Sequence, residues 1–309
     1  MLTTILLGVR DPVSLNASKW DYTLQPITRC YFNIKPSEID LVKFADGEVL
    51  VVLPEAYTRG SVVLIQTLSA PVNDAIMHTV FALEALKLTC AKNIILIISY
   101  LGYARQDRLT RAHSLISCSV VCKLLCVNAP ARVYLLEPHT PQVLGLLNAP
   151  SFSFGLTAAI CEHISRLYKL SELVIISLDH GAEHRALKVS KALDVKMISG
   201  SKHRENDRVN VTFQHNPRLT GKTGIIIDDI IDTGKSVASA TCSLLTTLSL
   251  KRVLVYCVHG VLSGELPRCV ELCVSNSIPR KHYSVDAAYT ISRLIKRVLA
   301  NKCVDELLF

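Results

Sequence analysis

The stretch IIIDDIIDTGKSVASA, residues 225–240, decides the fold and raises the first question about function. It contains Gly-Lys-Ser, the last three letters of a P-loop. A P-loop also needs a glycine five positions before that glycine, and Asp229 stands there instead. An acid at this position would repel a triphosphate, so the stretch is not a nucleotide-binding P-loop.

The remaining pattern is a buried strand over residues 225–227, two acids at its carboxyl end, and a helix that begins near Val237. Ligands of an open parallel sheet bind at the carboxyl ends of its strands. A loop that opens a helix offers N–H groups and a positive dipole end to a phosphate. Thr233 and Ser236 add hydroxyl donors, and the pair Asp228–Asp229 can accept hydrogen bonds from vicinal hydroxyls. The pattern predicts a sugar phosphate site; the alternative is a turn that merely caps a helix.

Short apolar runs alternate with longer helical patterns along the whole chain. Between two of the runs, Asn73 is the expected N-cap of a helix that has Ile76, Val80 and Leu83 at helical spacing. Apolar strands with helices between them indicate parallel sheet covered on both faces, and therefore an α/β fold. The candidate strands are residues 62–66, 94–99, 133–136, 174–177, 225–227 and 253–258.

The length of 309 residues suggests two domains of ordinary size. Turn chemistry in LLNAPSFSFG, residues 146–155, divides the chain into two similar halves. We therefore expect domains over residues 1–150 and 151–309. The polar stretch at residues 199–210 looks like a mobile basic loop rather than a regular element.

Composition limits the class of protein. Apolar runs are too short to span a bilayer, and the N-terminus lacks the features of a signal peptide, which predicts a soluble cytoplasmic protein without a membrane partner. The net charge of +8 is scattered rather than clustered, which argues against nucleic-acid binding and fits small anions such as phosphates.

The eleven cysteines show no Cys-x-x-Cys pattern. Cys118, Cys122 and Cys126 recur every four residues, on one face of a helix. A metal site is conceivable there, but a buried cysteine that packs as a small hydrophobe is the favoured interpretation. Cys269 and Cys273 receive the same interpretation, and the expected compartment is reducing.

The acidic strand end resembles the phosphoribosyl-diphosphate motif of type I phosphoribosyltransferases, with Lys235 and Ser236 where Gly-Thr is usual. Other segments, in order from about residue 44 to 264, resemble the ribose-phosphate diphosphokinase family. They are FADGE (44–48), RG (59–60), IQTLSAPVND (65–74), YLGYARQDR (100–108), EPHTPQVLG (137–145), ISLDHG (176–181), SKHR (201–204) and VHGVLSG (258–264).

This resemblance implies an N-terminal synthase domain and a C-terminal phosphoribosyltransferase-like domain, each a mostly parallel sheet flanked by helices. It implies transfer of the diphosphoryl group of ATP to C1 of ribose 5-phosphate, with Mg²⁺ as cofactor. Phosphoryl chemistry of this kind depends on positioning and charge neutralisation. It also implies a homo-oligomer based on dimers, for which a hexamer is one arrangement.

By the same resemblance, residues Phe44, Asp46, Gly47 and Glu48 bind the adenine of ATP bound to a neighbouring subunit, and Arg105, Gln106, Asp107 and Arg108 contact the nucleotide. His139 and Asp179 are the metal ligands, of which the oxygen ligand suits Mg²⁺ better. Lys202 and Arg204 are catalytic, because two cations can neutralise charge that develops on the phosphates. Ribose 5-phosphate is bound by Arg204, Asp228, Asp229, Asp232, Thr233, Gly234, Lys235 and Ser236. Without the resemblance, the first two groups would be read as a polar turn and a solvated loop, in which Asp107 and Arg108 pair locally.

The chain departs from the family pattern at Lys235 and Ala182, each in place of a glycine, and at Leu115 and Ser119. A glycine at position 235 could adopt positive φ, so Lys235 is expected to carry a conformational cost. Two other functions stay open: a non-catalytic regulatory subunit, and a phosphoribosyltransferase. The retained basic pair and acids favour an active enzyme, and a transferase would leave FADGE and GYARQDR without a role.

Overall fold

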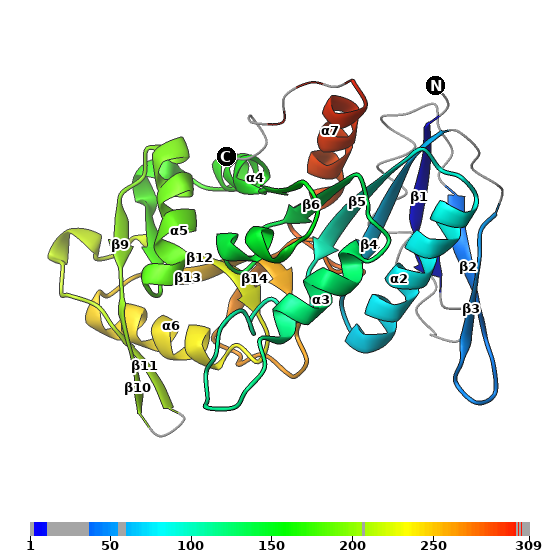
Figure 1. Cartoon of the computed structure of the whole chain (residues 1–309). Helices are drawn as coiled ribbons and strands as arrows, with labels where there is room; N and C mark the ends of the chain where they lie inside the picture. Colours follow the sequence, from blue (N-terminus) through cyan, green and yellow to red (C-terminus); the bar gives the residue numbers. More distant parts are fainter. Residues whose placement is uncertain are drawn as a thin grey trace. The chain divides into compact units, whose positions relative to one another are not determined.

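The computed structural model describes residues 3–10, 37–54, 60–205, 208–300, 302 and 304, with only the backbone for residues 3–10, 180, 202–205 and 208–210. The chain separates into two compact units (Figure 1). The first comprises residues 1–155, 277–281 and 288–308, and the second comprises most of residues 156–287. Residues 277–281 and 288–308 return to the first unit, which the sequence analysis did not expect. The domain boundary at residue 150 stays a prediction.

The first unit is built on a seven-stranded sheet with the order β3-β2-β1-β4-β5-β6-β7. All neighbouring strands are parallel except β2 and β3, which form an antiparallel hairpin. The strands are β1 (Thr3–Arg10), β2 (Ser37–Lys43), β3 (Val49–Val52), β4 (Ser61–Thr67), β5 (Asn93–Tyr100), β6 (Arg132–Leu136) and β7 (Ser151–Phe154). The helices are α2 (Val72–Leu88), α3 (Ser117–Cys126), η1 (Pro141–Leu146) and, except for its first residue, α7 (Ala287–Leu299).

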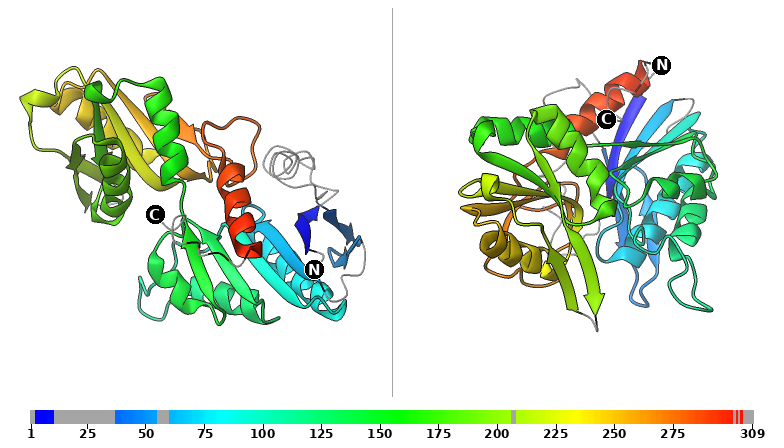
Figure 2. Two further views of the ribbon diagram at one scale, coloured as in Figure 1. Left: turned by 90° about the horizontal axis from the view of Figure 1, so that it is seen from above. Right: turned by 90° about the vertical axis from the view of Figure 1, so that its left-hand side faces the viewer.

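Strands β4 and β5 are buried on both faces, as their uninterrupted apolar runs predict. Helices α2 and α3 cover one face, where alternate residues of the central strands pack against them, and α7 lies on the other face (Figure 2). The prediction that Asn73 caps a helix is wrong. Helix α2 begins one residue earlier, and the Asn73 Oδ1 accepts a hydrogen bond from the Tyr103 hydroxyl at 2.6 Å instead.

The second unit is built on a five-stranded, wholly parallel sheet with the order β14-β13-β12-β8-β9. Helix α5 packs on one face, and α6 packs on the other. The strands are β8 (Leu173–Ser177), β9 (Met197–Ser199), β12 (Thr223–Ile231), β13 (Arg252–Gly260) and β14 (Glu271–Val274). The helices are α4 (Thr157–Leu167), η2 (Leu170–Glu172), α5 (His180–Leu193), η3 (Pro217–Leu219) and α6 (Lys235–Thr247). The predicted α/β fold of two parallel sheets flanked by helices is therefore confirmed.

The polar stretch at residues 199–210 was expected to form no element, and this expectation is wrong. Strands β10 (Ser201–Glu205) and β11 (Arg208–Thr212) form an antiparallel ribbon there. The missed signal is the alternation of Val209 and Val211 along β11. Val211 is 2% exposed and packs into the core of the second unit, which anchors the end of the ribbon.

The cysteines divide by burial. Cys118, Cys122 and Cys126 are buried on α3, as small hydrophobic residues would be. Cys269, however, is exposed and Cys273 only half-buried, so their interpretation as buried hydrophobes is wrong for the first and incomplete for the second. None of the helices in the described part of the chain combines the length and apolar character needed to cross a membrane.

Candidate active site

The acid pair of the second unit lies inside a strand rather than after it. Strand β12 pairs with β8 only as far as Ile226, but it continues beside β13 until Ile231. The predicted end of the strand at residue 227 is therefore four residues too early. The five residues after Ile226 remain in the strand because β13 continues to pair with them as far as Gly260. Asp228 and Asp229 therefore lie beyond the last residue of β12 that pairs with β8.

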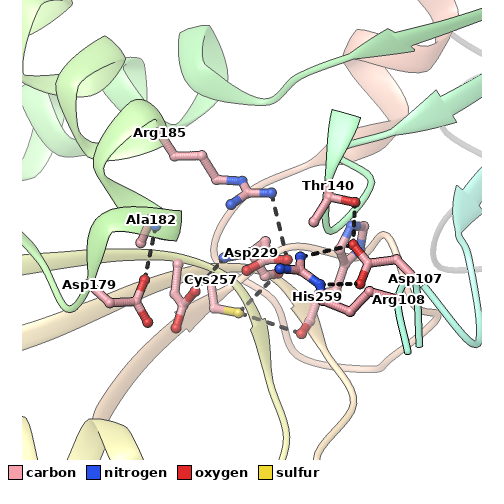
Figure 3. A network of polar contacts seen from close by, with 10 residues as sticks. Asp107, Arg108, Thr140, Asp179, Ala182, Arg185, Asp229, Cys257 and His259 are labelled. Atoms are coloured by element: carbon pink, nitrogen blue, oxygen red, sulfur yellow. Dashed lines mark hydrogen bonds and ion pairs between the residues drawn. The ribbon is translucent and has the colours of Figure 1, made fainter. Parts of the chain in front are cut away.

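Adjacent residues of a strand point to opposite faces, yet the carboxyl groups of Asp228 and Asp229 interact directly with each other. Asp229 is 4% exposed, and its Oδ2 lies 3.6 Å from the Arg185 Nη2 on α5 (Figure 3). Its backbone carbonyl accepts a hydrogen bond from the Cys257 thiol at 3.3 Å. Burial raises the pKa of that thiol well above its usual range, which makes Cys257 unreactive.

Asp228 is partly exposed at the surface, yet its carboxyl group has protein on most sides. This burial, followed by the negative charge of Asp229, raises the pKa of Asp228 well above the usual range. Its Oδ1 accepts a hydrogen bond from the Asp229 amide at 2.8 Å. A carboxyl group of raised pKa keeps its proton to higher pH, so Asp228 can donate a hydrogen bond to a ligand hydroxyl as well as accept one.

The turn after β12 leads directly into α6. Gly234 is its N-cap residue, with φ of +69°, and Lys235 is the first helical residue, two positions before the predicted start. No side chain of the N-cap residue covers the first amides of α6, so these N–H groups and the helix dipole point at the turn. Thr233 and Lys235 are exposed, and Ser236 is half-buried.

The expected conformational cost at Lys235 is not found. The positive φ belongs to Gly234, and Lys235 has an ordinary helical conformation. Gly234 is required on two counts, because a Cβ atom there would also lie 2.8 Å from the Leu266 Cδ2. The segment that carries Leu266 is fixed to the same turn, since the Ser263 amide donates to the Asp232 Oδ1 at 3.1 Å and the Ser263 hydroxyl donates to the same oxygen.

Asp179 follows β8 and is the N-cap of α5. Its Oδ1 accepts a hydrogen bond from the Ala182 amide at 3.1 Å, and its carbonyl accepts one from the Ser177 hydroxyl at 2.8 Å. Ala182, one of the departures from the family pattern, therefore contributes a backbone amide that glycine would supply equally. The contact fixes the Asp179 carboxylate at the edge of the sheet where β12 carries its acids.

In the first unit, the loop Arg105–Arg108 follows β5. Asp107 accepts from the Arg108 Nε at 2.9 Å and Nη2 at 3.1 Å, and from the Thr140 hydroxyl at 2.7 Å (Figure 3). The hydrogen bonds from Arg108, with a smaller contribution from Thr140, lower the pKa of Asp107 from 3.8 to about 2. Asp107 thus ties this loop to the loop after β6 that carries His139. Arg105 and Gln106 remain exposed.

The remaining predicted residues lie on two hairpins. FADGE forms the exposed turn between β2 and β3, closed by a hydrogen bond from the Phe44 amide to the Glu48 carbonyl at 2.8 Å. Gly47 has φ of +93°, and Phe44 is 49% exposed. Lys202 and Arg204 lie on β10, where the strand register pairs them with Val211 and Val209 of β11.

The second unit therefore brings Asp179, the acid pair and the Asp-Thr-Gly turn to one sheet edge, whereas the other predicted residues belong to the first unit or to the ribbon. Sequence reasoning missed three supporting residues: Arg185, Ser263 and Thr140. Thr140 and Ser263 lie within family-like segments but were given no role, because each of the three residues pairs with an acid far away in sequence. In the described part of the chain, no three side chains of His, Cys, Asp or Glu gather closely enough to form a metal cage.

Known proteins resemble this chain in both sequence and structure. Residues 20–128 match the N-terminal domain of ribose phosphate pyrophosphokinase, and residues 143–289 match the phosphoribosyl transferase domain. The chain is 32% identical over 251 residues to ribose-phosphate pyrophosphokinase of Bacillus caldolyticus, covering 79% of both chains. It is 35% identical over 242 residues to that of Bacillus cereus, covering 76% of both. Phosphoribosylpyrophosphate synthetase from Mycobacterium smegmatis superposes with a TM-score of 0.83 at 25% identity, over 97% of this chain and 100% of the other. The chain belongs to the ribose-phosphate pyrophosphokinase family.

Proposed function

We propose that this chain transfers the diphosphoryl group of ATP to the C1 hydroxyl of ribose 5-phosphate, giving phosphoribosyl diphosphate and AMP. The observation that carries the proposal is the edge of the second sheet. There an acid of raised pKa, Asp228, stands beside a glycine turn that opens α6. Hydroxyls and a phosphate on one small molecule match this combination, as in a sugar phosphate.

Ribose 5-phosphate is assigned to this edge. The 5-phosphate binds the first amides of α6 with the hydroxyls of Thr233 and Ser236, and the Asp228 carboxyl accepts from the ribose hydroxyls. Asp229 is assigned to positioning, because its carboxylate is buried and pairs with Arg185 of α5. Asp232 likewise positions the turn, through its hydrogen bonds from Ser263.

ATP is assigned to Arg105 and Gln106, whose side chains are exposed on the loop after β5. The guanidinium of Arg105 suits a phosphate or the face of adenine. Asp107 and Arg108 hold the loop in shape through their pair and through Thr140. Phe44, with Asp46 and Glu48, completes the adenine site of a neighbouring copy, which an exposed aromatic ring on a hairpin tip can do. The functional unit is therefore a homo-oligomer.

Mg²⁺ is the assigned cofactor. The cation prefers oxygen ligands and keeps several waters, so one or two carboxylates and the substrate phosphates are enough to hold it. Asp179 fits this donor set, because helix α5 fixes its carboxylate. His139 is the second assigned ligand. When bound, Mg²⁺ supplies positive charge to the phosphates that react.

Lys202 and Arg204 are assigned to the reacting phosphates. Both belong to strand β10 and lie two positions apart in the chain. Two such charges stabilise the negative charge that develops between the β-phosphate and AMP, which is worth most where water is excluded. The expected place of action is the cytoplasm, where both substrates are found.

The deciding experiment incubates the purified full-length chain with ATP, Mg²⁺ and ribose 5-phosphate, and quantifies AMP. AMP should form only when the sugar is present. A folded protein that makes none over a range of phosphate concentrations would support the regulatory-subunit alternative. Light scattering on the same sample should show an oligomer, and an active monomer would contradict the shared adenine site.

A further inference from the structure

The loop after β5, residues 101–108, is fastened at its start to helix α2. The Tyr103 hydroxyl donates to the Asn73 Oδ1 at 2.6 Å, and Asn73 belongs to the first turn of that helix. Gly102 is buried beside the same turn, because a Cβ atom there would lie 2.6 Å from the Leu68 carbonyl oxygen and 2.7 Å from the Val72 Cγ1. The start of the loop is therefore in direct contact with the start of α2.

Tyr103 also shapes the turn that carries Arg105. Its φ is +64°, in the left-handed region that a residue with a bulky side chain seldom adopts. Its carbonyl accepts a hydrogen bond from the Gln106 amide at 2.9 Å, which closes the turn. Within this turn, Ala104 is 3% exposed and packs into the core of the first unit, whereas Arg105 is exposed. A conformation of this kind persists only where the surroundings hold it, and the bond to Asn73 is one such contact.

The later part of the loop is fixed as well. The Gln106 carbonyl accepts a hydrogen bond from the Cys118 amide at 3.2 Å, at the start of α3. Asp107 accepts the hydrogen bond from the Thr140 hydroxyl in the loop after β6. Arg105 therefore lies between two fixed parts of the loop. A side chain on a backbone that is already ordered loses less conformational freedom when it binds a ligand.

We propose that Tyr103 and Asn73 are positioning residues for the nucleotide, because their hydrogen bond holds the loop in the conformation in which Arg105 and Gln106 meet ATP. This inference rests on the proposed function, which assigns ATP to the loop. Neither Tyr103 nor Asn73 is assigned a contact with the substrate. Loss of their bond should weaken the binding of ATP and leave that of ribose 5-phosphate unchanged, since the sugar phosphate is assigned to the second unit. Asn73 thereby gains a function in place of the predicted helix cap.

The test measures the Kd for ATP by calorimetry on the full-length chain with Mg²⁺ and without ribose 5-phosphate. Tyr103→Phe removes one oxygen and keeps the ring, and its Kd should rise by about three- to tenfold, as loss of one hydrogen bond implies. Asn73→Ala should give a similar rise. The double variant should bind no more weakly than either single variant, because all three lack the same bond. The matched control is Tyr134→Phe, which removes a hydroxyl from β6 of the same unit and should keep the native Kd.

Two further readouts separate positioning from a general loss of structure. The KM for ATP of Tyr103→Phe should rise with its Kd, whereas the KM for ribose 5-phosphate should stay at the native value. Amide hydrogen exchange of residues 101–108, measured without nucleotide, should quicken several-fold in Tyr103→Phe and Asn73→Ala but not in Tyr134→Phe. Circular dichroism checks that each variant is folded.

Two results would overturn the inference. One is a Kd for ATP in Tyr103→Phe that equals the native value. The other is a double variant whose loss of affinity is the product of the two single losses, since Tyr103 and Asn73 would then act independently. Failure of the proposed function looks different: a native chain that binds no ATP would remove the nucleotide from this loop, and the inference with it, whatever the variants do.

Discussion

Replacement of Gly234 by alanine tests whether the turn before α6 is shaped for a phosphate. The φ of +69° at this position suits glycine, and the added Cβ would lie 2.8 Å from the Leu266 Cδ2 and 3.3 Å from the Pro267 Cδ. The variant therefore meets two separate penalties. Either the backbone leaves its left-handed conformation, or Leu266 moves away from the turn.

The magnitude follows from these two contacts. An alanine forced to positive φ costs about 1 kcal/mol. A methyl group in occupied space costs about 1–3 kcal/mol more, and the lower end applies because Leu266 is a flexible, half-buried side chain. We expect Gly234→Ala to lower the free energy of unfolding of the second unit by about 2–3 kcal/mol. Because the first amides of α6 shift with the turn, the KM for ribose 5-phosphate should rise by roughly tenfold or more, as loss of about 1.4 kcal/mol of binding implies.

The matched control is Gly221→Ala. Gly221 has a similar φ of +75°, but a Cβ atom there meets nothing within 4 Å. The Gly221→Ala substitution should lower the free energy of unfolding by about 1 kcal/mol, the cost of a positive φ alone. It should leave the KM for ribose 5-phosphate unchanged. Urea denaturation and initial rates of AMP formation measure both quantities. Equal stability losses in the two variants would refute the packing argument, and an unchanged KM in a folded Gly234→Ala would remove the turn from the phosphate site.

Three further predictions concern charged residues. Alanine at Lys202 or Arg204 should lower kcat far more than it raises KM. Each substitution should raise the activation free energy by about 2 kcal/mol or more. Near-normal turnover in the double variant would exclude both residues from the mechanism. Lys235→Gly should leave the KM for ribose 5-phosphate nearly unchanged at low and moderate salt, because Lys235 is exposed and unstrained; a several-fold rise that shrinks with salt would instead indicate a phosphate contact. Asp107→Asn should lower the free energy of unfolding by about 1–2 kcal/mol at neutral pH. Since the pKa of Asp107 is lowered to about 2, its contribution is complete above pH 4 and is lost as the pH falls toward 2. Denaturation across this range should show the wild type and variant converging, and a constant difference would rule out the charged pair with Arg108 as the cause.

Burial explains which parts of the fold the sequence could predict. The predicted strand Ile94–Ser99 is apolar at every position except the last, because both faces of a parallel sheet are covered, and it lies within β5 as predicted. The ribbon of β10 and β11 was missed because its sequence is mostly polar, although Val211 packs into the core. The start of α6 was misplaced because a glycine of positive φ can be the N-cap residue without any capping side chain.

The candidate site shows the same limit. Local spacing found the Asp-Thr-Gly turn and both acids, because these residues are contiguous in sequence. Spacing does not reveal that Asp229 faces Arg185, or that Asp107 bonds to Thr140, since those partners are brought together only by the fold. A candidate site within one short segment can therefore be recognised from the sequence, whereas the distant residues that hold such a segment in place cannot.

The pair Asp228–Asp229 contains one residue of each kind, a proposed ligand-binding acid and an acid that holds the segment in place. The carboxyl groups of these two acids interact with each other, and the charge of Asp229 helps to raise the pKa of Asp228. Arg185 lies beside the buried acid, with its Nη2 3.6 Å from the Asp229 Oδ2, and so ties β12 to α5. In the proposed function, Asp228 is the acid that contacts the ligand and Asp229 is the structural anchor. The strand that carries both acids then keeps the proposed ligand group at a fixed distance from the turn that opens α6.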